Sequence, residues 1–288
     1  MTRLPIGRNV PRKPRVVGGV KGHNIKRNYL TGKPRPVARE LQIFPDGEKL
    51  IQAAAEHIIK ITSQGIAENG RVAIALSGGS TPRPLYTLLA SEAYSQSVDW
   101  PKVHLFWGDE RCVPPDSPES NYRMARETLL NAVRIPASNV HRIHGEENPE
   151  KAAAAYEEEL RTFFGVNATD GSLRQGFDLI LLGMGDNGHT ASLFPGSPAV
   201  NEKKRWVMAQ YVEVVSMWRI TLTPVVINSA KDILFIVSGA EKAERLHDVL
   251  KGPFQPEVLP AQIIKPARGR LLWLVDKAAA GRLERFPG

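Results

Sequence analysis

Short runs of consecutive apolar residues, rich in branched side chains, recur along the chain. The five runs are Val72–Leu76, Val103–Trp107, Leu179–Leu182, Ile233–Val237 and Leu271–Val275. Their residues are apolar almost throughout and do not alternate with polar ones, which is typical of strands that are buried on both faces. The pattern therefore predicts five strands of a mostly parallel sheet.

Longer stretches with apolar residues at helical spacing separate these runs. The predicted helices are Asp46–Asn69, Pro82–Ala90, Asn121–Asn131, Pro149–Phe164 and Ala240–Leu250. Strands that alternate with helices indicate a doubly wound α/β fold, in which helices cover both faces of the sheet. No internal repeat interrupts the pattern, so we expect one α/β domain over residues 40–288.

The first 39 residues differ from the rest in composition. The chain has 38 basic and 30 acidic residues and a formal net charge of +8, but eleven basic residues and no acidic one lie within residues 1–39. Residues 40–288 therefore hold 27 basic and 30 acidic residues, a net charge of −3. Five prolines and five glycines lie within residues 1–39, so we expect a disordered tail. A transit peptide, or a start of translation at Val37 or Leu41, is the alternative interpretation.

Cysteine usage and hydropathy suggest where the protein resides. Cys112 is the single cysteine, which excludes an intramolecular disulfide framework and fits a reducing compartment. No apolar run has the length of a membrane span, and the first 40 residues contain no apolar stretch like that of a secretory signal. We expect a cytoplasmic protein with no membrane partner. The basic tail is too short and proline-rich for a helix-turn-helix, so no specific nucleic-acid partner is expected.

Three glycine-rich polar segments directly follow predicted strands: Ser77–Pro82, Gly108–Arg111 and Gly183–His189. Ligands of doubly wound sheets bind beyond the carboxyl ends of the strands, so these segments are predicted to share one pocket. The first segment supplies backbone N–H groups and hydroxyls that suit an anion such as phosphate; the candidate residues are Ser77, Gly78, Gly79, Ser80 and Thr81. Alternatively, it is an ordinary strand-to-helix turn in which Thr81 caps the helix.

The other candidate residues of the predicted pocket are charged side chains and one histidine that could act as a base. Asp109 and Arg111 lie at a strand end, and His189 titrates near neutrality and is able to activate a water molecule. Arg219 and Lys242 suit a phosphate dianion. The sequence has no Walker loop, no metal-ligand spacing and no G-x-S-x-G elbow, and Cys112 is interpreted as a packing residue.

Together, these segments resemble the 6-phosphogluconolactonase family. The matching stretches run in the family's order: Ala75–Tyr86, Trp107–Pro115, Ser120–Ala125, Gly188–Gly196, Arg219–Leu222 and Ser238–Lys242. The resemblance implies hydrolysis of 6-phospho-D-glucono-1,5-lactone to 6-phospho-D-gluconate, a step of the oxidative pentose phosphate pathway. It implies no metal and no organic cofactor. It says nothing of the oligomeric state.

The resemblance also implies roles for the candidate residues. His189 would be the general base, and Asp109 and Arg111 would line the sugar cleft, with Arg111 or backbone N–H groups stabilising the oxyanion. The turn at Ser77–Thr81, together with Arg219 and Lys242, would hold the 6-phosphate.

One residue of the histidine segment departs from the family's pattern. The family usually reads Asp-Gly-His where this chain has Asn187-Gly188-His189, so the hydrogen bond of that aspartate can be kept but its charge is lost. Our hypothesis is that Asp186 or Asp109 supplies the charge instead.

Two other functions remain open at this point. Glucosamine-6-phosphate deaminases share the fold, but their pattern continues to a Phe-Asn-Glu-Pro segment whose glutamate acts in catalysis, and here Phe194 takes the place of that glutamate. A sugar-phosphate-sensing regulator on the same fold is the second alternative. Loss of lactone hydrolysis in a His189→Ala variant would separate the enzyme from the regulator.

Overall fold

The computed structural model describes residues 39–166, 169, 175–266 and 268–283. Of the expected tail, only Arg39 belongs to these residues, as the first residue of a strand. The expectations for residues 1–38 lie outside the described part of the chain.

The main sheet has six strands in the order β1 (Arg39–Phe44), β9 (Arg270–Asp276), β8 (Asp232–Val237), β5 (Leu179–Leu182), β2 (Val72–Leu76) and β3 (Val103–Trp107). Every neighbouring pair is parallel. All five predicted runs form strands, and the four central ones are almost entirely buried. The parallel sheet predicted from the apolar runs is therefore confirmed.

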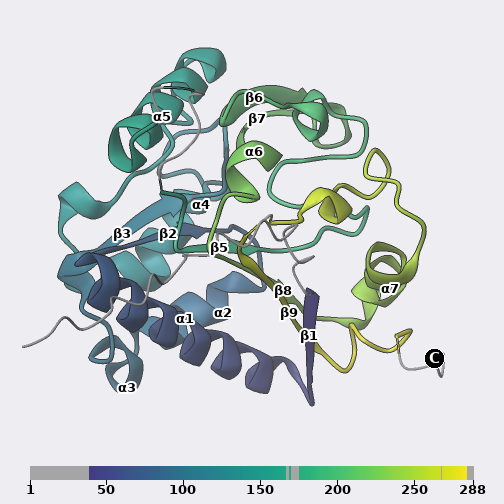
Figure 1. Ribbon diagram of the computed structural model, residues 1–288, viewed down its shortest axis with the longest axis horizontal. Coiled ribbons are helices and arrows are strands. Elements are labelled where there is room, and N and C mark those ends of the chain that lie inside the picture. Colours follow the sequence, from purple (N-terminus) through teal and green to yellow (C-terminus); the bar gives the residue numbers. More distant parts are fainter. Residues whose placement is uncertain (1–38, 167–168, 170–174, 267, 284–288) are drawn as a thin grey trace, which may run out of the picture. The chain divides into compact units, whose positions relative to one another are not determined.

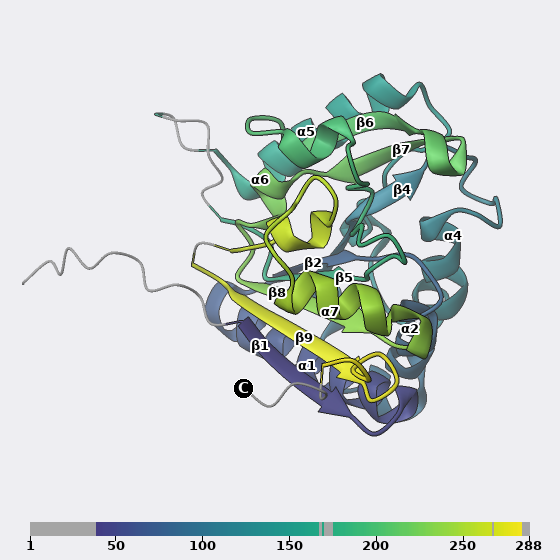
Figure 2. The ribbon, with the colours of Figure 1, turned by 90° about the vertical axis from the view of Figure 1, so that its right-hand side faces the viewer.

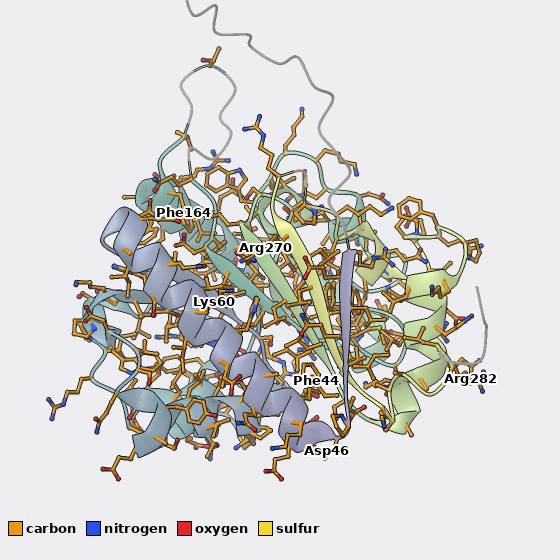
Figure 3. All side chains as sticks on the ribbon, turned by 60° about the horizontal axis from the view of Figure 1, so that its bottom comes forward. Phe44, Asp46, Lys60, Phe164, Arg270 and Arg282 are labelled. Atoms are coloured by element: carbon orange, nitrogen blue, oxygen red, sulfur yellow. The ribbon has the colours of Figure 1, made fainter. Side chains whose placement is uncertain are left out.

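The edge strand β1 was not predicted, because its residues are mostly exposed and alternate between polar and apolar. It pairs along its whole length with β9. In Figure 3, Phe44 at the end of β1 and Asp46 before the first helix lie at one end of the sheet, and Arg270 at the start of β9 lies toward the other.

The longer helices lie at or close to their predicted positions. They are α1 (Gly47–Asn69), α2 (Pro82–Ala90), α5 (Pro149–Phe164) and α7 (Ala243–Lys251). Asp46 caps α1 by accepting a hydrogen bond of 2.9 Å from the Lys49 N–H, and Gly70, with φ of 74°, ends it. Figure 1 shows α1 and α2 on one side of the main sheet and α5 and α6 (Pro224–Ile227) on the other, as a doubly wound fold requires.

Two predicted helices are less regular than expected. The stretch Asn121–Asn131 forms α4 (Asn121–Ala125) followed by a π-helical turn, η2 (Arg126–Leu130). The stretch that begins at Ala240 starts as a 3-10 turn, η6 (Ala240–Lys242), before α7. The sequence does not predict α6 or the other short elements, which are α3 (Glu92–Ser95), η1 (Trp100–Lys102), η3 (Ala137–Asn139), η4 (Pro198–Asn201), η5 (Glu213–Val215) and η7 (Pro260–Ile263).

A second, antiparallel sheet was not predicted at all. Its strands are β4 (Asp109–Arg111), β7 (Met217–Leu222) and β6 (Val207–Val212), in that order. Figure 2 shows these three strands on the side of the main sheet opposite α1. Because β4 directly follows β3, the antiparallel sheet brings β7 to the carboxyl end of the main sheet.

Among the described residues, none of the helices combines the length and the hydropathy that a membrane span requires. The same residues contain no group of three or more His, Cys, Asp or Glu side chains arranged to hold a metal ion.

Candidate active site

A pocket of about 300 Å³ lies beyond the carboxyl ends of β2, β3, β5 and β8. The sequence-predicted residues that line it are Ser77, Gly78, Gly79, Ser80, Thr81, Asp109, Arg111, His189, Arg219 and Lys242. Asn187 does not line the pocket but contacts His189. The three polar strand ends therefore meet in one place, as their positions after the strands predicted.

The imidazole of His189 is fixed by Asn187. Asn187 Oδ1 lies 2.6 Å from Nδ1 of His189 and accepts a second hydrogen bond, of 3.2 Å, from the His189 backbone N–H. A carbonyl oxygen only accepts, so Nδ1 carries the ring proton and Nε2 keeps its lone pair. The geometry thus selects the tautomer in which Nε2 is able to take up a proton.

Glycines and an aromatic ring determine where this imidazole lies. A Cβ on Gly185 would come within 2.0 Å of the His189 ring, so only glycine leaves room for it. On the other side, Phe194 stacks against the imidazole, with centroids 4.1 Å apart and planes 17° apart. His189 is consequently held between the backbone of Gly185 and an apolar ring.

Burial lowers the pKa of His189 to about 4 and thereby keeps the imidazole neutral. Among the nearby charges, Asp109 and Asp186 raise this pKa, while Arg219 and Lys242 lower it, and Asp109 has the largest effect of the four. Asp109 is buried, whereas the Asp186 side chain is 80% exposed and forms an ion pair with Lys242. Of the two carboxylates in our hypothesis, Asp109 thus acts more strongly on the histidine.

Asp109 is held by two residues that the sequence prediction missed. The Ser192 hydroxyl donates a hydrogen bond of 2.6 Å to Asp109 Oδ2, and the Asn121 amide donates to the Asp109 backbone carbonyl at 2.9 Å. Asn121 and Phe194 also line the pocket. All three lie inside the stretches that match the family, but their residue types alone carry no sign of such a role.

The turn at Ser77–Thr81 is held by Tyr86 of α2. The Tyr86 hydroxyl accepts a hydrogen bond from the Ser77 N–H and donates one to the Ser77 carbonyl. Gly79 has φ of 107°, a conformation that favours glycine. The alternative in which Thr81 caps α2 is wrong, because Thr81 is itself in the helical conformation and its side chain makes no capping hydrogen bond. Thr81 is one of the residues that line the pocket.

Arg111 and Arg219 are opposite each other in the β4–β7 ladder. The Nε atom of each is buried and has no hydrogen-bond partner among the described residues. Burial lowers the pKa of Arg219, and the charge of Arg111 lowers it further. Two adjacent guanidinium groups with unpartnered donors at the pocket wall are suited to bind an anion.

Cys112, next to Arg111, packs against the hydrophobic core. Burial raises the pKa of its thiol to about 11, so it is protonated at neutral pH. The interpretation of Cys112 as a packing residue is consistent with both observations.

The comparisons with known proteins agree on one family. Residues 45–273 match the family described as glucosamine-6-phosphate isomerases/6-phosphogluconolactonase. A 6-phosphogluconolactonase of Synechocystis is 41% identical over 248 residues, which cover 86% of this chain and 99% of that protein. The solved 6-phosphogluconolactonase of Trypanosoma brucei is 30% identical and has a TM-score of 0.76, with 86% of this chain and 99% of that one covered.

A monomeric glucosamine-6-phosphate deaminase shares the fold, with a TM-score of 0.70 at 21% identity, 84% of this chain and 99% of that one being covered. That likeness concerns the fold alone. The match to the family, over most of the chain, and the identity to the curated lactonases are independent of it. The chain belongs to the glucosamine-6-phosphate isomerase/6-phosphogluconolactonase family.

Proposed function

We propose that this chain hydrolyses 6-phospho-D-glucono-1,5-lactone to 6-phospho-D-gluconate, with Nε2 of His189 as the general base. The observation that carries the proposal is the hydrogen bond between Asn187 and His189, which leaves a neutral imidazole with a free Nε2 in the pocket. The names of the relatives, 6-phosphogluconolactonase, support the same reaction. As a lactone hydrolase, the enzyme belongs to the oxidative pentose phosphate pathway.

In the first step, Nε2 takes a proton from a water molecule as its oxygen attacks the lactone carbonyl carbon. The carbonyl oxygen becomes an oxyanion. Arg111 stabilises this charge through its guanidinium, a contribution typically of about 3 kcal/mol for one donor. The imidazolium that forms is stabilised by the carboxylate of Asp109, whose position is fixed by Ser192.

In the second step, the tetrahedral intermediate collapses. The bond between the carbonyl carbon and the ring oxygen breaks, and the imidazolium returns its proton to the departing ring oxygen. The product is the open-chain acid, and His189 is neutral again. These two reaction steps need neither a nucleophilic side chain nor an acyl-enzyme intermediate.

The 6-phosphate binds at the other side of the pocket. The turn at Ser77–Thr81 lines the pocket together with Arg219 and Lys242, and its hydroxyls and the positive charge of these two side chains would bind the phosphate. The guanidinium of Arg219, whose Nε has no hydrogen-bond partner among the described residues, would donate to the phosphate oxygens. Lys242 forms an ion pair with Asp186, so part of its charge is already compensated.

The deaminase alternative is disfavoured by Phe194. Its ring stacks on His189, so an apolar group occupies the place of the glutamate that deaminases use. Nothing in the pocket favours a regulator over an enzyme. We also propose a cytoplasmic location and no specific nucleic-acid partner, based on the single cysteine and the acidic body of the chain.

The experiment that tests this function is an assay of lactone opening with 6-phosphogluconolactone generated in place. The purified chain should accelerate opening well above the spontaneous rate. A rate equal to the spontaneous one would contradict the proposal.

A further inference from the structure

A buried glutamate, Glu110, lies between Asp109 and Arg111, and no step of the mechanism above uses it. Its exposed fraction is 3%. It does not line the pocket. A buried carboxylate is costly unless it is well hydrogen-bonded, so its partners indicate what it stabilises.

Four donors surround the Glu110 carboxylate. Oε1 accepts hydrogen bonds of 2.8 Å from the backbone N–H groups of Arg111 and Asn121. Oε2 accepts one of 2.8 Å from the Tyr122 N–H and one of 3.1 Å from the Ser120 hydroxyl. One carboxylate therefore joins β4 to the first turn of α4 and closes the loop between them.

Both ends of this closed loop contact groups of the proposed mechanism. Asn121, held through its backbone by Glu110, donates from its side chain to the Asp109 carbonyl at 2.9 Å and lies 3.4 Å from Asp109 Oδ1. Nη1 of Arg111 donates a hydrogen bond to the backbone carbonyl of Glu119, the residue that precedes Ser120. The position of the Asp109 carboxylate and that of the Arg111 guanidinium thus both depend on the closed loop.

Asn121 also contacts the turn at Ser77–Thr81, which is proposed to bind the phosphate. A Cβ on Gly78 would come within 1.8 Å of Asn121 Oδ1, so the backbone of Gly78 lies directly against this amide. A shift of Asn121 would therefore change the position of Gly78 as well as that of Asp109. The effect on Asp109 and Arg111 is the more direct, because hydrogen bonds connect them to the loop.

We propose that Glu110 is a positioning residue, which sets the places of Arg111 and Asp109 by fastening the loop from β4 to α4 through its four hydrogen bonds. The inference rests on the proposed lactone hydrolysis. Glu110 itself does not touch the substrate. Its contribution is exerted in the transition state, where a misplacement of about 1 Å is enough for a hundredfold loss of rate.

The test compares two Glu→Gln variants. In Glu110→Gln, an NH₂ group faces two donors and the loop loses its anchor. The matched control is Glu157→Gln on α5, because Glu157 Oε2 also accepts two backbone hydrogen bonds, of 2.9 Å from Trp206 and 3.1 Å from Val207, away from the pocket.

For Glu110→Gln we expect kcat to fall about tenfold to a hundredfold, while KM changes less than about threefold. Glu157→Gln should leave both constants within about threefold of the wild type. Equal losses in the two variants would show a merely structural role and overturn the proposal, as would an unchanged kcat in Glu110→Gln. An inactive wild type would instead contradict the proposed function.

A second variant covers the case in which Glu110→Gln does not fold. Ser120→Ala removes one of the four donors and leaves the carboxylate with its three backbone partners; it also removes the hydrogen bond that the Ser120 hydroxyl accepts from the Arg123 N–H at the start of α4. Its kcat should fall by about threefold to tenfold at constant KM. A wild-type kcat in Ser120→Ala would then overturn the proposal.

Discussion

Asn187 Oδ1 lies 2.6 Å from Nδ1 of His189, and this contact decides which ring nitrogen carries the proton. Because a carbonyl oxygen cannot donate, Nε2 is left without a proton in the neutral ring. An aspartate at position 187 would select the same tautomer. The difference between the two residues is therefore one of charge, and the proposed sources of that charge are Asp109 and Asp186, which both raise the pKa of His189.

Replacing Asn187 by Asp should change turnover at pH 7.5 by less than about threefold, since the tautomer stays the same. The added carboxylate favours the imidazolium, so the pKa of His189 should rise. Steady-state kinetics at several pH values measure both effects. Asn131→Asp, at an exposed position, serves as the control for charge. A gain in kcat of more than about tenfold would show that Asp109 and Asp186 do not supply the charge.

The activity should persist into acid. The pKa of His189 is about 4, so the base remains neutral until the pH falls through that value. We expect kcat/KM to reach half its maximum near pH 4, and a half-maximum near 6.5 would contradict the burial of the imidazole.

The same shift affects stability. Unfolded histidine takes up a proton near pH 6.5, but the folded ring does so only near pH 4. The contribution of His189 to the free energy of unfolding is therefore complete above pH 6.5 and is lost as the pH falls toward 4. Denaturant unfolding at several pH values measures this loss.

Gly185→Ala should abolish most of the activity. The new Cβ would lie within 2.0 Å of the imidazole and displace it from Asn187. A fall in kcat of about a hundredfold or more is expected, by analogy with other misplaced catalytic groups. Gly47→Ala is the control, because its Cβ would meet only the Ser238 hydroxyl at an ordinary 3.4 Å. Wild-type kinetics in Gly185→Ala would mean that the ring position is not critical.

The sequence predicts the parallel sheet well, because strands such as Leu179–Leu182 are buried on both faces and carry an unbroken apolar pattern. It does not predict β1, whose exposed edge residues carry no such pattern. The antiparallel sheet was missed for a related reason. Half of β7 is exposed or partly exposed, so its apolar residues do not form a recognisable run.

At the site, the sequence predicts the residues with distinctive chemistry, such as His189 and Arg219, since strand ends bring them together. It does not predict the residues that hold them. The hydroxyl of Ser192 reaches Asp109 across 83 positions of the chain, and no local pattern marks such a contact. The helix after Thr81 begins at Pro82 as predicted, but Thr81 already has helical backbone angles, and no local sequence pattern shows that its side chain makes no capping hydrogen bond.

The central claim is that His189 is the general base of lactone hydrolysis. The most direct measurement is the initial rate of 6-phosphogluconolactone opening by the wild type and by His189→Ala, each corrected for the spontaneous rate. We expect strong acceleration by the wild type and a loss of about a hundredfold to ten-thousandfold in kcat for the variant, with KM little changed. A His189→Ala variant that opens the lactone at the wild-type rate would contradict this claim.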